Sequence, residues 1–135
     1  MEPIEINAGT WYLRALRADE RIDDRPALAE GGITDPEHVA RRAADWAEET
    51  RYSWAVCEPT TAELMAEIVL TPGADGTAEI TGWARAGQEP ALAAARTAVA
   101  RFAEGALGLA HRLNLRPARS GPGRGRRRRG RAARR

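Results

Sequence analysis

The chain has 135 residues, of which 43% are hydrophobic and one is a cysteine, so it can form one globular domain but neither a second domain nor an internal disulfide or a cysteine-based zinc site. No stretch reaches the roughly 20 apolar residues of a membrane-spanning helix, and the acidic start lacks the pattern of a secretion signal, so we expect a cytoplasmic protein without membrane contact. The net charge of +2 is divided unevenly, because residues 116–135 hold ten of the 21 basic residues and no acid, which leaves residues 1–115 with a formal charge of −8.

The first 30 residues predict two strands and a helix. Residues 4–16 alternate between apolar and polar positions on either side of the turn signal at 7–9, which favours two short strands. Residues 18–30 predict a short charged helix that is interrupted at Pro26 and ended by two glycines.

A second helix is predicted to begin at Thr34, because a capping residue, a proline and an acid follow one another there. We expect an apolar stripe on this helix to face the core: Val39, Ala43, Trp46 and Ala47. His38, near the helix start, is expected to be solvated.

The middle of the chain predicts consecutive strands. Apolar runs at 52–57 and 64–70 are separated by a turn at 58–61, and a loop rich in Gly, Pro and Asp at 71–76 precedes a third, alternating run. These strands should be antiparallel and linked by hairpins. With the flanking helices they predict a mixed α/β sheet.

Residues 77–109 predict a strand, a tight loop and a helix. Apolar and polar residues alternate from 78 to 84, and Pro90 precedes an alanine-rich segment that has no Gly or Pro from 91 to 104. We expect one face of this helix to be apolar: Leu92, Ala95, Val99, Phe102 and Ala106. The first N–H groups of such a helix lack partners within it, so the helix start can bind an anion.

Three motifs in this region resemble the central part of the GNAT superfamily of N-acetyltransferases, in the branch that acetylates ribosomal-protein N-termini and many small amines. They are the strand Ala78–Trp83, the loop Gln88–Ala93 and the helix end Leu107–Leu109, followed by a segment at 111–115 that resembles the family's next strand. The resemblance spans residues 4–115. It implies an incomplete, mixed and mainly antiparallel sheet flanked by helices, in a partial acetyltransferase domain at 1–115.

The resemblance also implies acetyl-CoA as co-substrate and a primary amine, either a protein N-terminus or a small amine, as acceptor. In the family the loop amides hold the pyrophosphate of acetyl-CoA, and the helices before the sheet form one wall of the acceptor cleft. The resemblance implies that His38 and Trp46 could line this cleft. The matching cofactor-binding residues are Trp83, Ala84, Arg85, Gln88, Glu89, Pro90, Ala91, Leu92 and Ala93.

A carboxylate on a strand near the cofactor often serves as the base in this family. Glu79 is therefore the first candidate for the catalytic residue and Glu67 the second. The alternative for each is a solvated surface charge. No metal site is expected.

The loop departs from the family's pattern at three positions. Ala91 stands where the family has Gly, Pro90 lacks an N–H, and Glu89 brings a negative charge to a site for an anion. An interpretation that these differences leave open is a GNAT-like domain without catalytic activity.

Residues 116–135 combine ten arginines with Gly, Pro and Ala and have nothing to bury, so the sequence predicts a disordered tail. The family has a further helix and strands at this point, which favours a truncated or frameshifted acetyltransferase whose uncovered sheet edge could pair with another chain. The alternative is a nucleic-acid-binding protein that uses the tail for salt-sensitive, sequence-independent contacts. No aromatic residue is interleaved in the tail to stack on bases.

Overall fold

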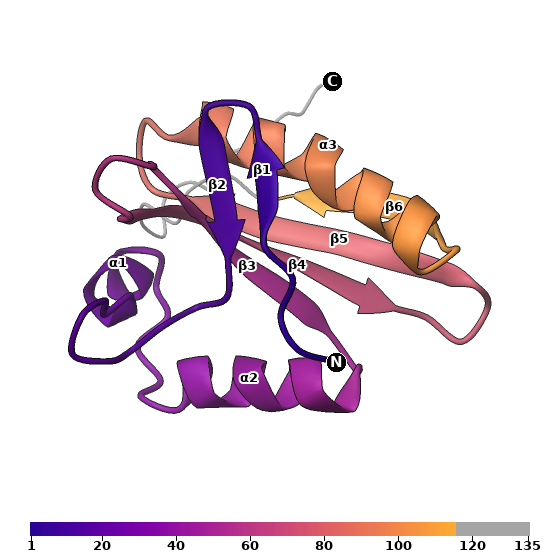
Figure 1. Cartoon of the computed structure of the whole chain (residues 1–135), viewed down its shortest axis with the longest axis horizontal. Helices are drawn as coiled ribbons and strands as arrows, with labels where there is room; N and C mark the ends of the chain where they lie inside the picture. The colour runs from indigo at the N-terminus through magenta and orange to yellow at the C-terminus, as the bar shows by residue number, and fades with distance from the viewer. Residues whose placement is uncertain (116–135) are drawn as a thin grey trace, which may run out of the picture.

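The computed structural model describes residues 1–115, with side chains as far as Ala110 (Figure 1). Six strands and three helices follow one another in this range: β1 Ile6–Ala8, β2 Trp11–Arg14, α1 Arg25–Glu30, α2 His38–Glu48, β3 Tyr52–Cys57, β4 Leu64–Pro72, β5 Thr77–Ala84, α3 Glu89–Ala106 and β6 Ala110–Leu115. The predictions of a disordered tail, a truncation and a nucleic-acid arm concern residues outside this range.

The strands form one sheet in the order in which they occur in the chain. β1 to β5 pair antiparallel with their neighbours, whereas β6 pairs parallel with β5. A parallel pair needs a crossover connection, and α3 supplies it between β5 and β6. The predicted mixed, mainly antiparallel sheet flanked by helices is therefore confirmed.

The helices lie on opposite faces of the sheet (Figure 1). α3 packs on β4 and β5, and α2 packs against β3. Leu28 of α1 belongs to the apolar cluster that contains Trp83 of β5 and Cys57 of β3. The strand residues therefore divide into those that face α3 and those that face α1 and α2.

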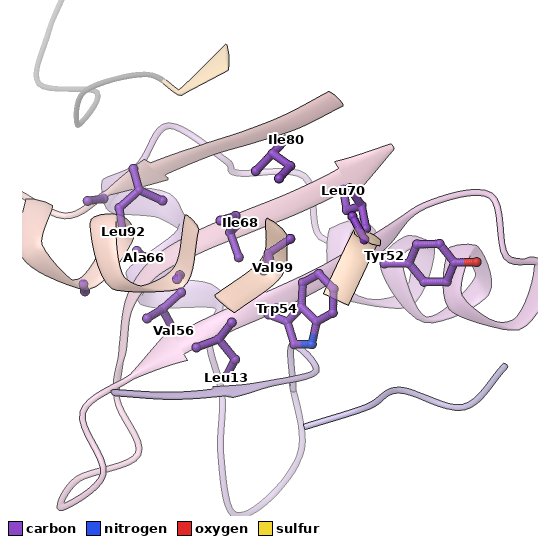
Figure 2. Packing of buried hydrophobic residues seen from close by; sticks show 14 of the residues in the cluster. Leu13, Tyr52, Trp54, Val56, Ala66, Ile68, Leu70, Ile80, Leu92 and Val99 are labelled. Atoms are coloured by element: carbon purple, nitrogen blue, oxygen red, sulfur yellow. The ribbon is translucent and has the colours of Figure 1, made fainter. Parts of the chain in front are cut away.

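The core between the sheet and α3 is apolar (Figure 2). Ala66, Ile68, Leu70 and Ile80 from the strands meet Val99 from the helix, and all five are fully buried. An aromatic group extends this core, with the Trp54 ring edge-on to those of Trp46 and Phe102 at centroid distances of 5.3 and 5.4 Å. Five of the helix residues are buried: Ala91, Leu92, Ala95, Val99 and Ala103. The predicted apolar face is thus correct in its middle, while Phe102 is half-buried and Ala106 is exposed.

The first predicted helix is wrong over residues 18–24, because α1 begins only at Arg25. Asp19 makes the preceding segment a turn: its carboxylate accepts hydrogen bonds from the backbone N–H groups of Arg21 and Ile22 at 2.9 and 3.0 Å. Pro26 lies in the first turn of α1 and does not interrupt the helix. A proline is tolerated there because its missing N–H would have no partner within the helix.

The second predicted helix is wrong in its start and in part of its buried face, since Trp46 is buried and Val39 half-buried as expected. α2 begins at His38, four residues after the expected cap. Ala43 and Ala47 are exposed, whereas His38 and Trp46 are buried. The residues of α2 that face the sheet are those at positions 38, 42 and 46. The polar ones, His38 and Arg42, lie close to Glu67 of β4.

Candidate functional site

A buried carboxylate lies at the centre of the sheet. Glu67 of β4 is 2% exposed. Its Oε1 accepts a hydrogen bond from Trp83 Nε1 at 2.9 Å, and its Oε2 lies 2.9 Å from His38 Nε2. Arg42 Nε is 3.7 Å from the same Oε2, which is an ion pair but too long for a hydrogen bond. Burying a charge is costly without such partners, and here both carboxylate oxygens have one.

Strand pairing and helix periodicity bring these residues together. Glu67 is opposite Trp83 in the antiparallel register of β4 and β5, so their side chains project from the same face of the sheet. His38 and Arg42 are four residues apart on α2 and therefore share one side of that helix. Gly31 fits against the indole of Trp83, since a Cβ at this glycine would lie 2.5 Å from the ring.

A pocket of about 230 Å³ opens beside this carboxylate. Its lining comes from the end of α1, from α2 and from the two central strands: Gly31, Ile33, Arg42, Glu67, Val69, Thr81, Gly82 and Trp83. Apolar walls thus surround one anionic group, one cationic group and one hydroxyl. A concave apolar pocket with a few convergent polar groups is the common form of a ligand site.

The predicted strand, loop and helix are confirmed beside this pocket. β5 ends at Ala84 and α3 begins at Glu89, with Pro90 in its first turn. Gly87 has a φ of 80° in the intervening turn, a conformation that glycine adopts without strain. The N–H of Ala91 donates to Gln88 O at 3.0 Å, so this amide is already engaged at the helix start.

The predicted cofactor-binding residues lie along this one segment. Trp83 contributes to the pocket, and three of the others are buried: Ala84, Ala91 and Leu92. Glu89, Pro90 and Ala93 are exposed, and Gln88 is half-buried.

Arg85 is engaged with carboxylates. Its guanidinium donates to Glu30 of α1 at 2.9 and 3.0 Å and to Glu63 at 2.9 Å. The hydrogen bonds to these two groups hold the pKa of Arg85 above its ordinary value. The side chain therefore connects the loop to α1 and to the start of β4.

The two candidate bases occupy different places. Glu79 is half-buried on β5, opposite Thr71, and lies two residues from Thr81 on the same face of the strand. It is not among the residues that line the pocket, whereas Glu67 is. The expected alternative of a solvated surface charge is wrong for Glu67.

Sequence reasoning missed Arg42 and the contact of His38 with Glu67. The signal that could have found them is the lone acid in the apolar run 64–70, because a charge in a buried strand needs a partner. Positions 38, 42 and 46 follow the helical repeat and would have supplied one. The expectation that His38 is solvated is wrong, since its side chain is 11% exposed.

None of the helices in residues 1–115 is long and apolar enough to cross a membrane. The same residues contain no group of three or more His, Cys, Asp and Glu side chains that could hold a metal ion.

Neither a protein-family model nor a curated protein matches the chain. Solved structures do. A protein from Vibrio cholerae, provisionally named a ribosomal-protein-serine acetyltransferase, superimposes with a TM-score of 0.68 at 18% identity, covering 85% of this chain and 75% of that one. An acetyltransferase from Agrobacterium tumefaciens str. C58 superimposes with a TM-score of 0.55 at 20% identity, covering 81% and 71%. The sheet with its β5–α3–β6 crossover, and the helices on either face, therefore have the GNAT fold of these acetyltransferases.

Proposed function

We propose that the chain is a GNAT-type N-acetyltransferase that transfers the acetyl group of acetyl-CoA to a primary amine. One observation carries the proposal: the fold shared with acetyltransferases holds a pocket on β5, directly before the loop and helix start that resemble the family's pyrophosphate site. Strand β5 connects these two parts of the candidate site, the pocket and the start of α3.

The distances along β5 suit this arrangement. Gly82 lines the pocket and the strand ends two residues later at Ala84, which is about 7 Å at the rise of an antiparallel strand. A phosphate at the start of α3 would meet the positive end of the helix dipole. An acceptor in the pocket and a coenzyme phosphate at the loop would then lie at the two ends of one short segment.

The reaction needs one proton to leave. An amine that enters as an ammonium ion must lose a proton before its nitrogen attacks the thioester, and the products are an amide, a thiol and that proton. We propose Glu79 as the group that accepts it. Its place on the same face of β5 as Thr81 supports this role.

The first test is binding of acetyl-CoA to the full chain, measured by calorimetry at moderate and high salt. We expect saturable binding of one molecule per chain that survives the higher salt. A synthetic peptide of residues 116–135, titrated in the same way, measures the attraction of coenzyme A phosphates to the arginines alone. Binding by the chain that matches the peptide at every salt concentration would refute the proposal and favour an inactive domain.

The second test is catalytic. With a reactive amine, the Glu79→Gln variant should release coenzyme A at least about tenfold more slowly and still bind acetyl-CoA, because removing a base affects the transition state and not the binding of the thioester. Unchanged turnover would remove Glu79 from the mechanism.

A second candidate function rests on the ten arginines of residues 116–135. They support sequence-independent binding of nucleic acid, which would show a steep fall of the logarithm of the binding constant with the logarithm of salt concentration. A chain without these residues serves as the control. Equal binding by both chains would exclude this role.

A further inference from the structure

We propose that Arg85 is a positioning residue for the acceptor in the proposed acetyl transfer. Its ion pairs with Glu30 and Glu63 hold the end of α1 and the start of β4 against the end of β5, and so fix the walls of the pocket. The guanidinium itself contacts neither the acceptor nor acetyl-CoA. This inference rests on the proposed function, because it assigns a task within that reaction.

All three nitrogens of the Arg85 guanidinium donate to protein oxygens. Nε and Nη2 bind the two carboxylate oxygens of Glu30 at 3.0 and 2.9 Å, a paired geometry that the single ammonium group of a lysine does not offer. Nη1 donates to Glu63 at 2.9 Å and to the backbone oxygen of Leu64 at 3.1 Å. The side chain is 20% exposed, so a ligand in solvent meets little of it. Arg85 is therefore placed to join three segments of the chain.

Each of these segments carries a residue that lines the pocket: Gly31 after α1, Glu67 of β4 and Trp83 of β5. Glu30 directly precedes Gly31, where a Cβ would lie 2.5 Å from the indole of Trp83, so the end of α1 packs closely on this ring. Arg85 follows the same tryptophan by two residues, and Glu63 directly precedes β4. A movement of Glu30 away from Arg85 would therefore move one wall of the pocket away from the others.

The position of α1 depends on contacts with the rest of the chain. The helix has six residues, and helices this short are not stable alone in water. Leu28 packs its middle into the apolar cluster with Trp83, and Arg85 binds its last residue. Because the Glu30 side chain is 56% exposed, this ion pair adds little to the stability of the whole chain. Its loss should affect the position of α1 more than it affects folding.

The first test measures hydrogen exchange of the backbone amides of residues 31–33 in the full chain. These amides donate to carbonyl groups of α1, so their exchange rates report opening of its end. Glu30→Gln and Arg85→Gln should each speed this exchange by about fivefold, the effect of losing an ion pair of this kind. Glu48→Gln removes an exposed acid at the end of α2 and should leave the rates unchanged. Unchanged rates in Glu30→Gln and Arg85→Gln would overturn the proposal.

The second test separates positioning from contact with the coenzyme, with butylamine as the acceptor probe. At saturating acetyl-CoA, Glu30→Gln and Arg85→Gln should each lower kcat/KM for the amine by about tenfold, because a small displacement of the reacting groups is costly in the transition state. Calorimetry should show the same affinity for acetyl-CoA in both variants and in the unchanged chain. Weaker acetyl-CoA binding in Arg85→Gln but not in Glu30→Gln, which releases the guanidinium, would show contact with a coenzyme phosphate and overturn the proposal.

The double variant tests whether Glu30 acts through Arg85. If it does, Glu30→Gln combined with Arg85→Gln should be no slower than Arg85→Gln alone. Effects that multiply would overturn the proposal and leave the proposed function intact. If the unchanged chain transfers no acetyl group to butylamine or to a peptide N-terminus, the proposed function fails. The exchange rates at 31–33 then still decide whether Arg85 holds the end of α1.

Discussion

The two faces of the sheet bury very different side chains. The face toward α3 is apolar, and residues such as Ile68, Leu70 and Ile80 are fully buried there. The face toward α1 and α2 buries the carboxylate of Glu67 and, beside β2, the pair formed by Arg14 and Asp24. One sheet thus combines an apolar core on one side with a set of buried charges on the other.

The difference indicates that the two faces contribute differently to stability and to the placement of side chains. Apolar burial supplies most of the free energy of folding, at about 25 cal/mol per Å². Buried ion pairs add little net stability, because removing the charges from water costs as much as their attraction returns. The charges on the α1 and α2 face therefore serve to fix the positions of the side chains that they bind. The pocket lies on this face.

The largest effect is expected on the apolar face. Trp54 is fully buried, meets the rings of Trp46 and Phe102, and donates its Nε1–H to Ile4 O at 2.7 Å. Trp54→Ala should lower the free energy of unfolding by about 5 kcal/mol, the upper end for loss of a large core side chain. Urea unfolding measures this. A loss below about 2 kcal/mol would show that this face does not dominate stability.

The next effect concerns the buried pair on the other face. Asp24 accepts two hydrogen bonds of 2.9 Å from the guanidinium of Arg14, whose side chain is 5% exposed. Asp24→Ala leaves that charge without its partner and should cost about 3 kcal/mol.

The matched control replaces both charges with apolar residues. Arg14→Met with Asp24→Leu should recover most of the stability that Asp24→Ala loses, because no buried charge remains. A double variant as unstable as the single one would show that the pair itself stabilises the fold.

The elements on the α3 face of the sheet were predicted from the sequence better than those on the opposite face. Alternation in β5 and the repeat of apolar residues in α3 follow directly from burial against an apolar core, so these elements were predicted with the correct type and nearly the correct bounds. A strand at 111–115 was expected only from the family resemblance, and its parallel pairing with β5 was not predicted.

The other face was harder to predict because its contacts join polar residues that are far apart in the chain. A capping signal at Thr34 placed the start of α2 too early, although the helix begins where His38 reaches Glu67. The first helix starts later in the structure than predicted because Asp19 binds the nearby backbone N–H groups of Arg21 and Ile22 in a turn. Residue type can show that a buried charge needs a partner, but it does not show which distant residue supplies it.

A smaller change in stability is expected when either of two glycines is replaced by alanine, and its direction should differ between them. A Cβ at Gly31 would lie 2.5 Å from the ring of Trp83, so Gly31→Ala must displace the indole and should cost about 2 kcal/mol. Gly105, in α3, has open space where its Cβ would be. Gly105→Ala should therefore raise stability by about 0.5–1 kcal/mol.

The same pair of variants tests the site. A displaced indole loses its hydrogen bond to Glu67, so Gly31→Ala should also slow the proposed acetyl transfer to an amine, whereas Gly105→Ala should not. Loss of stability in Gly31→Ala with an unchanged rate of acetyl transfer would show that the packing of Trp83 does not affect the pocket.

An effect that depends on pH is expected from Cys57, which is buried on the face toward α1 and α2 but has no charge at neutral pH. Burial raises the pKa of its thiol from 9.0 to about 12, so in the folded chain the thiol keeps its proton after an unfolded chain has lost it. The folded state then binds more protons than the unfolded state above pH 9, and stability falls as the pH rises from 9 toward 12. The slope from this group is at most about 1.4 kcal/mol per pH unit.

Cys57→Ala removes this titration while it keeps a small apolar side chain in the cluster with Trp83. The difference in the free energy of unfolding between the two chains should therefore shrink as the pH rises from 8 to 10.5. A difference that stays constant over this range would show that the thiol ionises as readily in the folded chain as in the unfolded one. In that case water reaches Cys57, and the face toward α1 and α2 is open to solvent at this point.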